Sequence, residues 1–569
     1  MICKLSAIIK FSFLFILLSY IFISFSYAND NVFSLSIEKL LNLEIDISSN
    51  NKTTIREQPS TVTILTHDYI MSSGSRYLMD LLQQVPGFWI GTDTIGTFST
   101  SFRGVWGMEA KILLIIDGIE QNELAFGSLA LGARYPTSNI HQVEIIRGPG
   151  SVKFGGQAAL AVIRITSLIA NQSNQSNQSN QSNQSNQSNQ SNQSNQSISL
   201  TSDLGLASNH NINLHYIITG DNQIKQQKLK YGFSASFGHG DYSDKNWTAL
   251  DAYQLPLKNN ANSKPINLNV FLDIYQWKFN LQYEKFEQED RLLFGDSGIF
   301  FSPNKKYTQK NHLSFLHQAI SADKKWVIDD NFSLDIKFTY TNQKPWNSKG
   351  QYQHNVSRGL NRARFDLSGI YNLSKKSNIF FGTSYYYETA EITQSYLFDP
   401  KVRYQGKNTA NNDDYSIYSQ FETQLDWGKL TLGGRFEDHE FAGNEFVPRV
   451  SLTKLWQKLH LKLVYNEAFK IPQFDTVASA ENANTPITKI EKTKSWEVET
   501  GYQFNPDLTI TSNFYLQKIN HYIGFNPQSA NNTTLGDFSS YGAEVQLNWQ
   551  LNKLYLNVSY SLFAIEKIT

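Results

Sequence analysis

The chain has 569 residues, with 50 Lys or Arg and 50 Asp or Glu, so its formal net charge at pH 7 is zero. This balance offers no basic excess for binding nucleic acid. Cys3 is the only cysteine, which excludes intramolecular disulfides and cysteine-based metal sites.

The first 28 residues have the three parts of a signal peptide. Lys4 and Lys10 give a positive start, Phe11–Phe25 is almost entirely apolar, and Ser26–Ala28 ends in a small residue. We therefore expect cleavage before Asn29. A retained transmembrane helix is the alternative, although the later chain has no other apolar run near the roughly 20 residues that a span needs.

Residues 29–54 are polar and too short to form a domain of their own. Within them, Leu43, Glu44, Ile45, Asp46 and Ile47 form an extended-prone stretch in an otherwise disordered lead. Such a stretch can add to a partner's sheet through backbone hydrogen bonds. A plain linker, preceded by a short helical turn, is the alternative interpretation.

Residues 55–168 have the pattern of a small mixed α/β unit. Thr61–Thr66 is strand-like, Tyr77–Val85 has helical spacing, and Lys111–Ile116 is a buried-looking strand that ends in a turn signal. Two further apolar strands, Val143–Ile146 and Ala161–Thr166, complete the unit.

A glycine-rich turn separates these last two strands. It consists of Arg147 followed by Gly148, Pro149, Gly150 and Ser151. The glycines have no side chains to keep the backbone away from a neighbouring wall. Taken alone, this motif predicts only a tight turn.

Residues 169–197 form a linker that contains nine uninterrupted copies of Asn-Gln-Ser. The tract has no apolar residue and cannot join a core, so we expect a disordered, tolerated insertion. A ligand-binding or aggregation-prone tract is the alternative.

Residues 198–569 alternate between apolar and polar positions. Phe332–Tyr340 alternates without a break, and Leu554, Leu556 and Val558 face the opposite way from Tyr555 and Asn557. Aromatic residues make up 13% of the chain, as expected for aromatic girdles. We predict a mainly β fold, a transmembrane antiparallel β-barrel rather than a soluble sandwich.

In both halves, the order of short motifs resembles that of the TonB-dependent outer-membrane receptors. The resemblance covers most of residues 35–563 and is stronger in the first half than in the second. It is carried by Glu57–Ile64, Ser101–Gly104, Leu113–Gly118, Val143–Phe154, Tyr465–Pro472, Ser495–Tyr502 and Tyr541–Val545.

The resemblance implies an α/β plug domain inside the lumen of the barrel, in the bacterial outer membrane. It further implies a TonB energy-coupling complex as partner, contacted by Leu43–Ile47, and a metal-chelate ligand such as a ferric siderophore or a cobalamin. Plug loops Thr92–Thr100 and Leu124–Arg134 would face that ligand. We expect a monomer in contact with outer-membrane lipid, with no cofactor, no metal ligands of its own and no catalytic residues.

A buried salt-bridge cluster is expected to position the plug in the barrel. Arg103 and Arg147 lie beside glycines, while Glu499 and Glu544 lie on strands at positions expected to face inward. Glu497 points the same way as Glu499, and exposed surface charge is the alternative for all of them.

The C-terminal end of the sequence predicts an incomplete barrel. Only 25 residues follow Glu544, and they end on a polar sequence. We expect roughly 16–18 strands and an unclosed wall, against about 22 strands in a complete receptor. A non-transporting surface-binding barrel, or a non-functional truncated fragment, are the alternatives to an energised importer.

Overall fold

The computed structural model describes most of the chain after residue 36. The predicted signal peptide and nearly all of the Asn-Gln-Ser tract lie outside the described residues. These are 37–92, 97–107, 109–171, 196–205, 211–224, 227–241, 246–248, 254–256, 262–290, 311–349, 357–394, 404, 406–440, 443–482, 490–526, 531–551 and 554–568, all within one compact unit.

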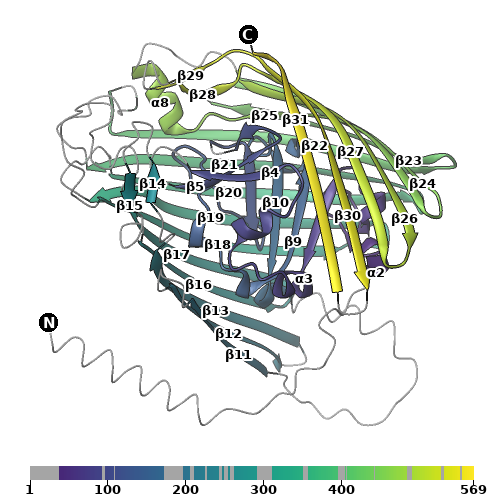
Figure 1. Cartoon of the computed structure of the whole chain (residues 1–569), viewed down its shortest axis with the longest axis horizontal. Coiled ribbons are helices and arrows are strands. Elements are labelled where there is room, and N and C mark those ends of the chain that lie inside the picture. The colour runs from purple at the N-terminus through teal and green to yellow at the C-terminus, as the bar shows by residue number, and fades with distance from the viewer. Residues whose placement is uncertain are drawn as a thin grey trace. The chain divides into compact units, whose positions relative to one another are not determined.

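Seventeen strands form a single antiparallel sheet in chain order, which we call the wall (Figure 1). Its strands are β11 (Gln196–Gly205), β12 (Asn211–Ile224), β13 (Gln227–Asp241), β16 (Asn262–Ile274), β17 (Trp277–Asp290), β18 (Asn311–Val327), β19 (Phe332–Lys349), β20 (Ser357–Ser374), β21 (Ser377–Gln394), β22 (Thr409–Leu425), β23 (Gly428–His439), β24 (Gly443–Leu455), β25 (Leu459–Lys470), β26 (Glu491–Asn505), β27 (Leu508–Asn520), β30 (Phe538–Leu551) and β31 (Leu554–Ile568).

The wall has its apolar side chains on the outside. In β22, Tyr415 and Ile417 are 55% and 64% exposed, whereas the alternate residues Ser416, Tyr418 and Gln420 are buried on the inner face. A soluble sheet has the reverse arrangement, so this pattern is that of a membrane barrel.

β11 and β31 are the first and last strands of the wall and form its two edges. Among the described residues, β11 pairs only with β12, and β31 pairs only with β30. The seventeen strands and the open sheet agree with the expected 16–18 strands and unclosed wall.

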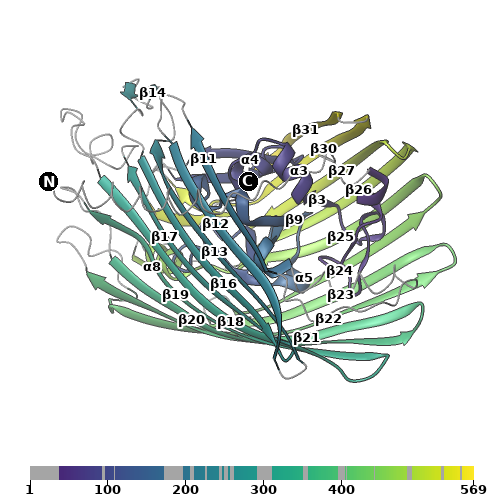
Figure 2. The same cartoon turned by 90° about the horizontal axis from the view of Figure 1, so that it is seen from below.

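A second, smaller group of elements lies on the concave side of the wall (Figure 2). Its five-stranded sheet has the order β3-β9-β10-β7-β8, in which β10 and β7 are parallel. Of the central strands, β7 is a continuous apolar run, as expected for a strand that is covered on both faces. The elements are β3 (Val62–Thr66), α3 (His67–Ser72), α4 (Leu78–Leu82), β4 (Phe88–Thr92), β5 (Phe98–Phe102), β6 (Val105–Trp106), β7 (Ile112–Ile116), β8 (Ile119–Glu120), β9 (Ile140–Arg147), α5 (Ser151–Phe154) and β10 (Ala161–Ser167). We call this group the plug.

The described part of the N-terminal lead is folded against the plug. After α2 (Ile37–Leu41), β1 (Glu44–Ile45) pairs with β2 (Thr53–Thr54), and the side chains of Ile45 and Ile47 are buried beside those of the plug sheet. The expectation of a disordered lead is therefore wrong for residues 37–54.

The two ends of the wall differ in their connections. Tight turns such as Tyr275–Gln276, Lys375–Lys376 and Asp426–Trp427 close one end of the strands. At the other end β25 finishes at Lys470 and β26 begins only at Glu491, and α8 (Phe474–Asn482) lies between them in the chain. No helix in the described part of the chain has the length and apolar character needed to cross a membrane.

Candidate functional site

The turn between β5 and β6 presents Arg103 to the wall. Arg103 and Gly104 have φ angles of 52° and 80°, as in the two-residue turns that suit tight hairpins. A Cβ on Gly104 would lie 2.3 Å from the ring of Phe563 in β31, so only glycine permits this approach. The arginine beside it is 1% exposed.

Arg103 binds two carboxylates on the inner face of the wall. Its Nε donates to Oε1 of Glu544 at 2.8 Å, and its Nη1 and Nη2 donate to the two oxygens of Glu497 at 3.1 and 3.0 Å. Glu497 lies on β26 and Glu544 on β30, and both are nearly fully buried. Such forked, charge-assisted contacts fix both distance and orientation.

Arg147, at the end of β9, joins the same group. Its Nη1 donates to Oε2 of Glu544 at 3.1 Å, and its carbonyl oxygen accepts from Nη2 of Arg103 at 3.3 Å. Asn513 of β27 donates to Glu497 at 2.9 Å. We call Arg103, Arg147, Glu497 and Glu544 the arginine–carboxylate cluster; its two positive and two negative charges balance.

An aromatic ring completes the surroundings of Arg103. The centre of the Tyr515 ring lies 4.0 Å from the guanidinium carbon of Arg103. The neighbouring strand has Gly542 opposite Tyr515, and a Cβ there would lie 2.4 Å from the tyrosine hydroxyl. The missing side chain leaves room for the ring beneath the arginine, a favourable cation–π geometry.

The charge of Arg103 is retained in this buried place. Burial by itself lowers the pKa of the guanidinium, but Glu497 and Glu544 outweigh burial and raise this pKa above its ordinary value. Removing one partner would leave a buried, uncompensated charge. The cluster therefore resists any displacement of the plug from the wall.

The Gly148–Ser151 turn lies against the same carboxylate. Gly148 has a φ of 144°, and a Cβ on it would lie 2.6 Å from Oε1 of Glu497. A Cβ on Gly150 would lie 2.6 Å from Val162 of β10. Pro149 lies between these two close approaches, and Ser151 begins α5.

The structure does not bring Glu499 to the plug arginines. Glu499 pairs instead with Lys462 at 2.9 Å and with His460 at 3.1 Å. Because alternate residues of β26 share the inner face, Glu497 and Glu499 were both possible partners, and the strand register places Glu497 opposite Tyr515, under Arg103. Lys462 in turn donates to the plug carbonyl oxygens of Ile55 and Ser60, each at 3.0 Å.

The opposite stretch of the wall, β13 to β19, meets the plug mainly through neutral side chains. Gln282 accepts from Gln121 at 2.8 Å, and Ser234 accepts from Asn139 at 2.9 Å. We call this contact region the amide seam; it also includes Asn267, Gln343 and the backbone groups that they bind. A cavity of about 60 Å³ lies along it, and the ion pair Arg134–Glu284, at 2.6 Å, crosses it.

The plug loop Leu124–Arg134, which was expected to face the ligand, is covered in this structure. Leu124 and Ala125 are 2% and 1% exposed and pack against Phe474 of α8. The backbone N–H of Asp475 donates to the carbonyl oxygen of Ala125 at 2.9 Å. The other expected loop, Thr92–Thr100, lies partly outside the described residues.

An ion pair holds the N-terminal stretch Leu43–Ile47 on the plug. Asp46 accepts from Nη2 of Arg164 at 2.7 Å, and Nζ of Lys153 donates to the Asp46 carbonyl oxygen at 2.5 Å. Burial raises the pKa of Asp46, but Arg164 and Lys153 outweigh it and hold this pKa below its usual range. Burial also lowers the pKa of Lys153 to about 8.

Comparison with known families assigns both parts of the chain. Residues 54–162 match the sequence model described as "TonB-dependent Receptor Plug Domain", and residues 269–567 match that described as "TonB dependent receptor-like, beta-barrel". The chain belongs to the TonB-dependent receptor family. This receptor is therefore an outer-membrane protein.

Individual relatives are distant in sequence. The receptor is 26% identical over 123 residues to a vitamin B12 transporter of Vibrio vulnificus, a match that covers 21% of this chain and 20% of that protein. It is 22% identical over 554 residues to the iron-regulated outer membrane virulence protein of Vibrio cholerae, covering 89% of this chain and 75% of the relative. The receptor thus spans about a fifth of the vitamin B12 transporter that it matches.

Solved structures share the fold of this receptor. The siderophore receptor PirA of Acinetobacter baumannii has a TM-score of 0.64 at 14% identity, covering 89% of this chain and 80% of its own. The FrpB iron transporter of Neisseria meningitidis has a TM-score of 0.67 at 13% identity, and the match covers 90% of this chain and 80% of the transporter. Since outer-membrane barrels have short turns on the periplasmic side, Lys375–Lys376 lies at the periplasmic end of this receptor and α8 at the outer end.

Proposed function

We propose that this receptor imports a scarce metal chelate, a ferric siderophore or a cobalamin-type ligand, with energy from the TonB complex. The arginine–carboxylate cluster is the observation that supports this most. It ties the plug to the inner face of the wall through buried ion pairs, and breaking such a pair costs about 3–5 kcal/mol. A bulky ligand passes only when the plug moves, so transport needs external work.

The relatives support the class of ligand. The Vibrio vulnificus relative is named a vitamin B12 transporter, the Vibrio cholerae relative is iron-regulated, and PirA is a siderophore receptor. All three names concern iron or a metal chelate. The receptor's role is binding and translocation without covalent chemistry, so we propose that it is not an enzyme.

We propose that Leu43–Ile47 is the segment that contacts TonB. In this structure Ile45 pairs with Thr53, and Asp46 pairs with Arg164 on the plug. Pairing with a partner's sheet would replace the Ile45–Thr53 contact with an equivalent one, because both are backbone pairings of an extended strand. The receptor would act as a monomer whose apolar outer face contacts membrane lipid.

Uptake by a receptor-deficient strain tests this proposal. Cells carrying the receptor are given one iron chelate or cobalamin at a time, and both surface binding and accumulation of the labelled ligand are measured. Deleting Leu43–Ile47 should leave binding intact and abolish accumulation. The matched control deletes two Asn-Gln-Ser copies within Asn171–Ser197 and should change neither quantity.

Two results would contradict the proposal. Binding without accumulation in the unaltered receptor would favour a non-transporting surface binder. Accumulation that persists after deletion of Leu43–Ile47 would show either that TonB is not required or that it contacts another segment, and a strain lacking TonB separates these two outcomes.

A further inference from the structure

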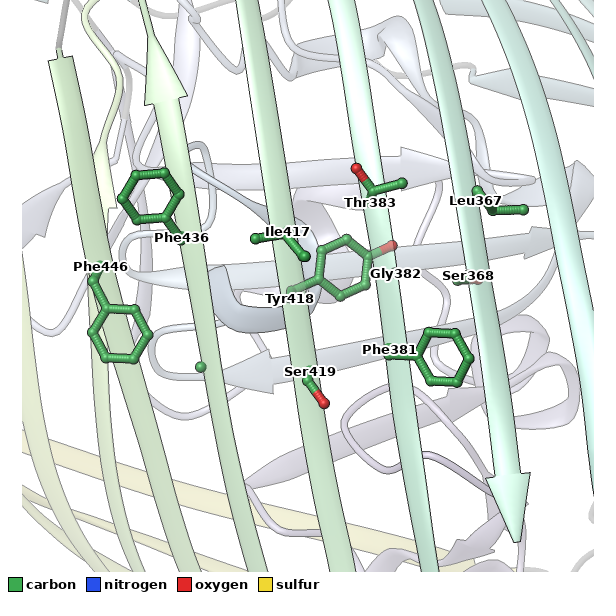
Figure 3. A pocket seen from close by; sticks show the side chains of 11 residues that line it. Leu367, Ser368, Phe381, Gly382, Thr383, Ile417, Tyr418, Ser419, Phe436 and Phe446 are labelled. Atoms are coloured by element: carbon green, nitrogen blue, oxygen red, sulfur yellow. The ribbon is translucent and has the colours of Figure 1, made fainter.

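The outer face of the wall has a hollow of about 530 Å³ over β20 to β24 (Figure 3). Its floor is formed where two small residues, Ser419 and Gly434, lie opposite each other on β22 and β23. Larger apolar side chains surround this floor: Phe381, Ile417, Phe436 and Phe446. The hollow is thus a notch in an otherwise bulky apolar surface.

The hollow faces lipid. Ile417 and Phe446 are 64% and 55% exposed on the outer face, whereas the alternate residues Tyr418 and Arg435 are buried on the inner face. Exposed Trp427 and Trp456 lie near the periplasmic turns, and Tyr387 and Tyr415 lie further toward the outer end. Aromatic side chains at both ends mark the borders of the apolar band of a membrane barrel.

The depth of the hollow suits the inner leaflet. Ser419 is six residues from the end of β22 at Leu425, and Gly434 is six residues from the start of β23 at Gly428. At about 3.3 Å per residue and a strand tilt near 45°, six residues correspond to roughly 14 Å of depth. An acyl chain from the periplasmic leaflet spans a similar depth, about half of the roughly 30 Å hydrocarbon core.

Positive charge lies below the hollow. The β20–β21 turn carries Lys375 and Lys376, which lie six and five residues before Phe381 of the hollow's rim. The Lys376 side chain is 68% exposed and forms a long ion pair, 3.9 Å, with the fully exposed Asp426. Exposed lysines beside a membrane attract anionic headgroups.

We propose that this hollow is a binding site for one acyl chain of an anionic phospholipid. The chain lies over Ser419 and Gly434 between the four apolar side chains, and its phosphate lies at Lys375 and Lys376. A single lipid then bridges four neighbouring strands on the side of the wall that faces the membrane. The proposal depends on the outer-membrane location of the receptor and not on which ligand the receptor imports.

Native mass spectrometry of the purified full-length receptor tests the acyl-chain site. The receptor in detergent is titrated with phosphatidylglycerol, and the bound fraction is compared for unaltered receptor, Ser419→Leu and Ala322→Leu. Ala322 also faces outward, opposite the exposed Phe338, but lies on β18 outside the hollow, so it is a matched control. We expect Ser419→Leu to weaken the tightest binding about tenfold, as loss of roughly two buried methylene groups would, and Ala322→Leu to leave it unchanged.

The headgroup is tested separately by Lys375→Gln combined with Lys376→Gln. This variant should lose the preference for phosphatidylglycerol over phosphatidylcholine while still binding both. Gly434→Ala changes the same floor by another route. Its Cβ would lie 2.9 Å from the ring of Phe446, so this rim side chain must shift, and binding should weaken in the same direction as in Ser419→Leu. Equal lipid binding by Ser419→Leu and Ala322→Leu, or an unchanged headgroup preference in the lysine variant, would overturn the proposal.

Discussion

Two stretches of the wall hold the plug by different chemistry. Strands β26 to β30 contact it through the arginine–carboxylate cluster, in which every charge has an opposite partner. Strands β13 to β19 contact it through the amide seam, where neutral groups predominate. A neutral hydrogen bond contributes about 0.5–1.5 kcal/mol and can be exchanged for water, whereas a buried charge cannot lose its partner cheaply.

The two regions therefore play different parts: the cluster fixes the position of the plug, and the seam can let it move. The cluster tolerates only one arrangement of plug and wall, because any shift would leave buried charges without partners in a poorly solvating environment. The seam offers alternative donors and acceptors, and its cavity of about 60 Å³ has room for about two waters. We therefore expect the plug to separate from the wall along the amide seam first. Among the described residues on that side, the Arg134–Glu284 ion pair resembles the contacts of the cluster, and Lys337 of β19 also donates to the carbonyl oxygen of Gly118 in the plug.

Among the substitutions that test this contrast, Glu544→Ala should have the largest effect on the stability of the plug. It removes the partner of both Arg103 and Arg147, and we expect the plug to lose about 3–5 kcal/mol of stability. This loss of stability would be measured by following protease cleavage within the plug as the denaturant concentration is raised. Glu391→Ala, at an exposed position on β21, is the control and should change stability by less than about 0.5 kcal/mol.

Comparing Glu497→Gln with Glu499→Gln tests which of the two glutamates is the partner of Arg103. Glu497→Gln weakens two hydrogen bonds from Arg103 and should cost about 1.5–3 kcal/mol, the range for bonds to charged groups. Glu499→Gln leaves Arg103 untouched and should change plug cleavage less. If Glu499→Gln proved the more damaging of the two, the assignment of Glu497 as the arginine partner would be wrong.

Substitutions in the amide seam should be mild and additive. Gln282→Ala and Asn267→Ala each remove neutral contacts to the plug, so each should cost about 0.5–1.5 kcal/mol. Because these residues share no partner with Glu544, their effects should add to that of Glu544→Ala within about 0.5 kcal/mol. Strong coupling between the two regions would argue against independent contacts.

The smallest effect is expected at the N-terminal stretch. The lowered pKa of Asp46 means that its pairing with Arg164 stabilises the folded segment fully above about pH 4, and that this stabilisation declines progressively as the pH falls from there toward the lowered pKa. A spin label at Leu43 should therefore be more mobile at pH 3 than at pH 7, and Asp46→Asn should raise its mobility at pH 7. Glu44→Gln, an exposed neighbour, is the control. Equal mobility in Asp46→Asn and Glu44→Gln would show that the ion pair does not hold the segment.

The sequence could predict the wall and part of the cluster. Alternating residues reveal strands, and glycines beside Arg103 and Arg147 indicate close approach, so three of the four expected residues meet in the structure. Strand alternation could not choose between Glu497 and Glu499, because both face inward and only the register with β27 distinguishes them.

Other features depended on contacts between distant segments. Leu124–Arg134 has the composition of an exposed loop, yet α8, more than 300 positions later, covers it. The amide seam has no signal in the sequence, since Asn, Gln and Ser are equally common on surfaces. The burial of Ile45 and Ile47 likewise follows from the plug sheet against which they pack.

A pair of double-mutant cycles tests the central contrast most directly. One cycle combines Arg147→Ala with Glu544→Ala in the cluster, and the other combines Asn139→Ala with Ser234→Ala in the seam, with plug stability as the measured quantity. In the cluster, the double variant should be no less stable than the less stable of the two single variants, which corresponds to a coupling energy of about 1.5–3 kcal/mol between Arg147 and Glu544. In the seam, the coupling energy between Asn139 and Ser234 should stay near about 0.5 kcal/mol. Additive effects in the cluster, or equal coupling in both cycles, would contradict the account.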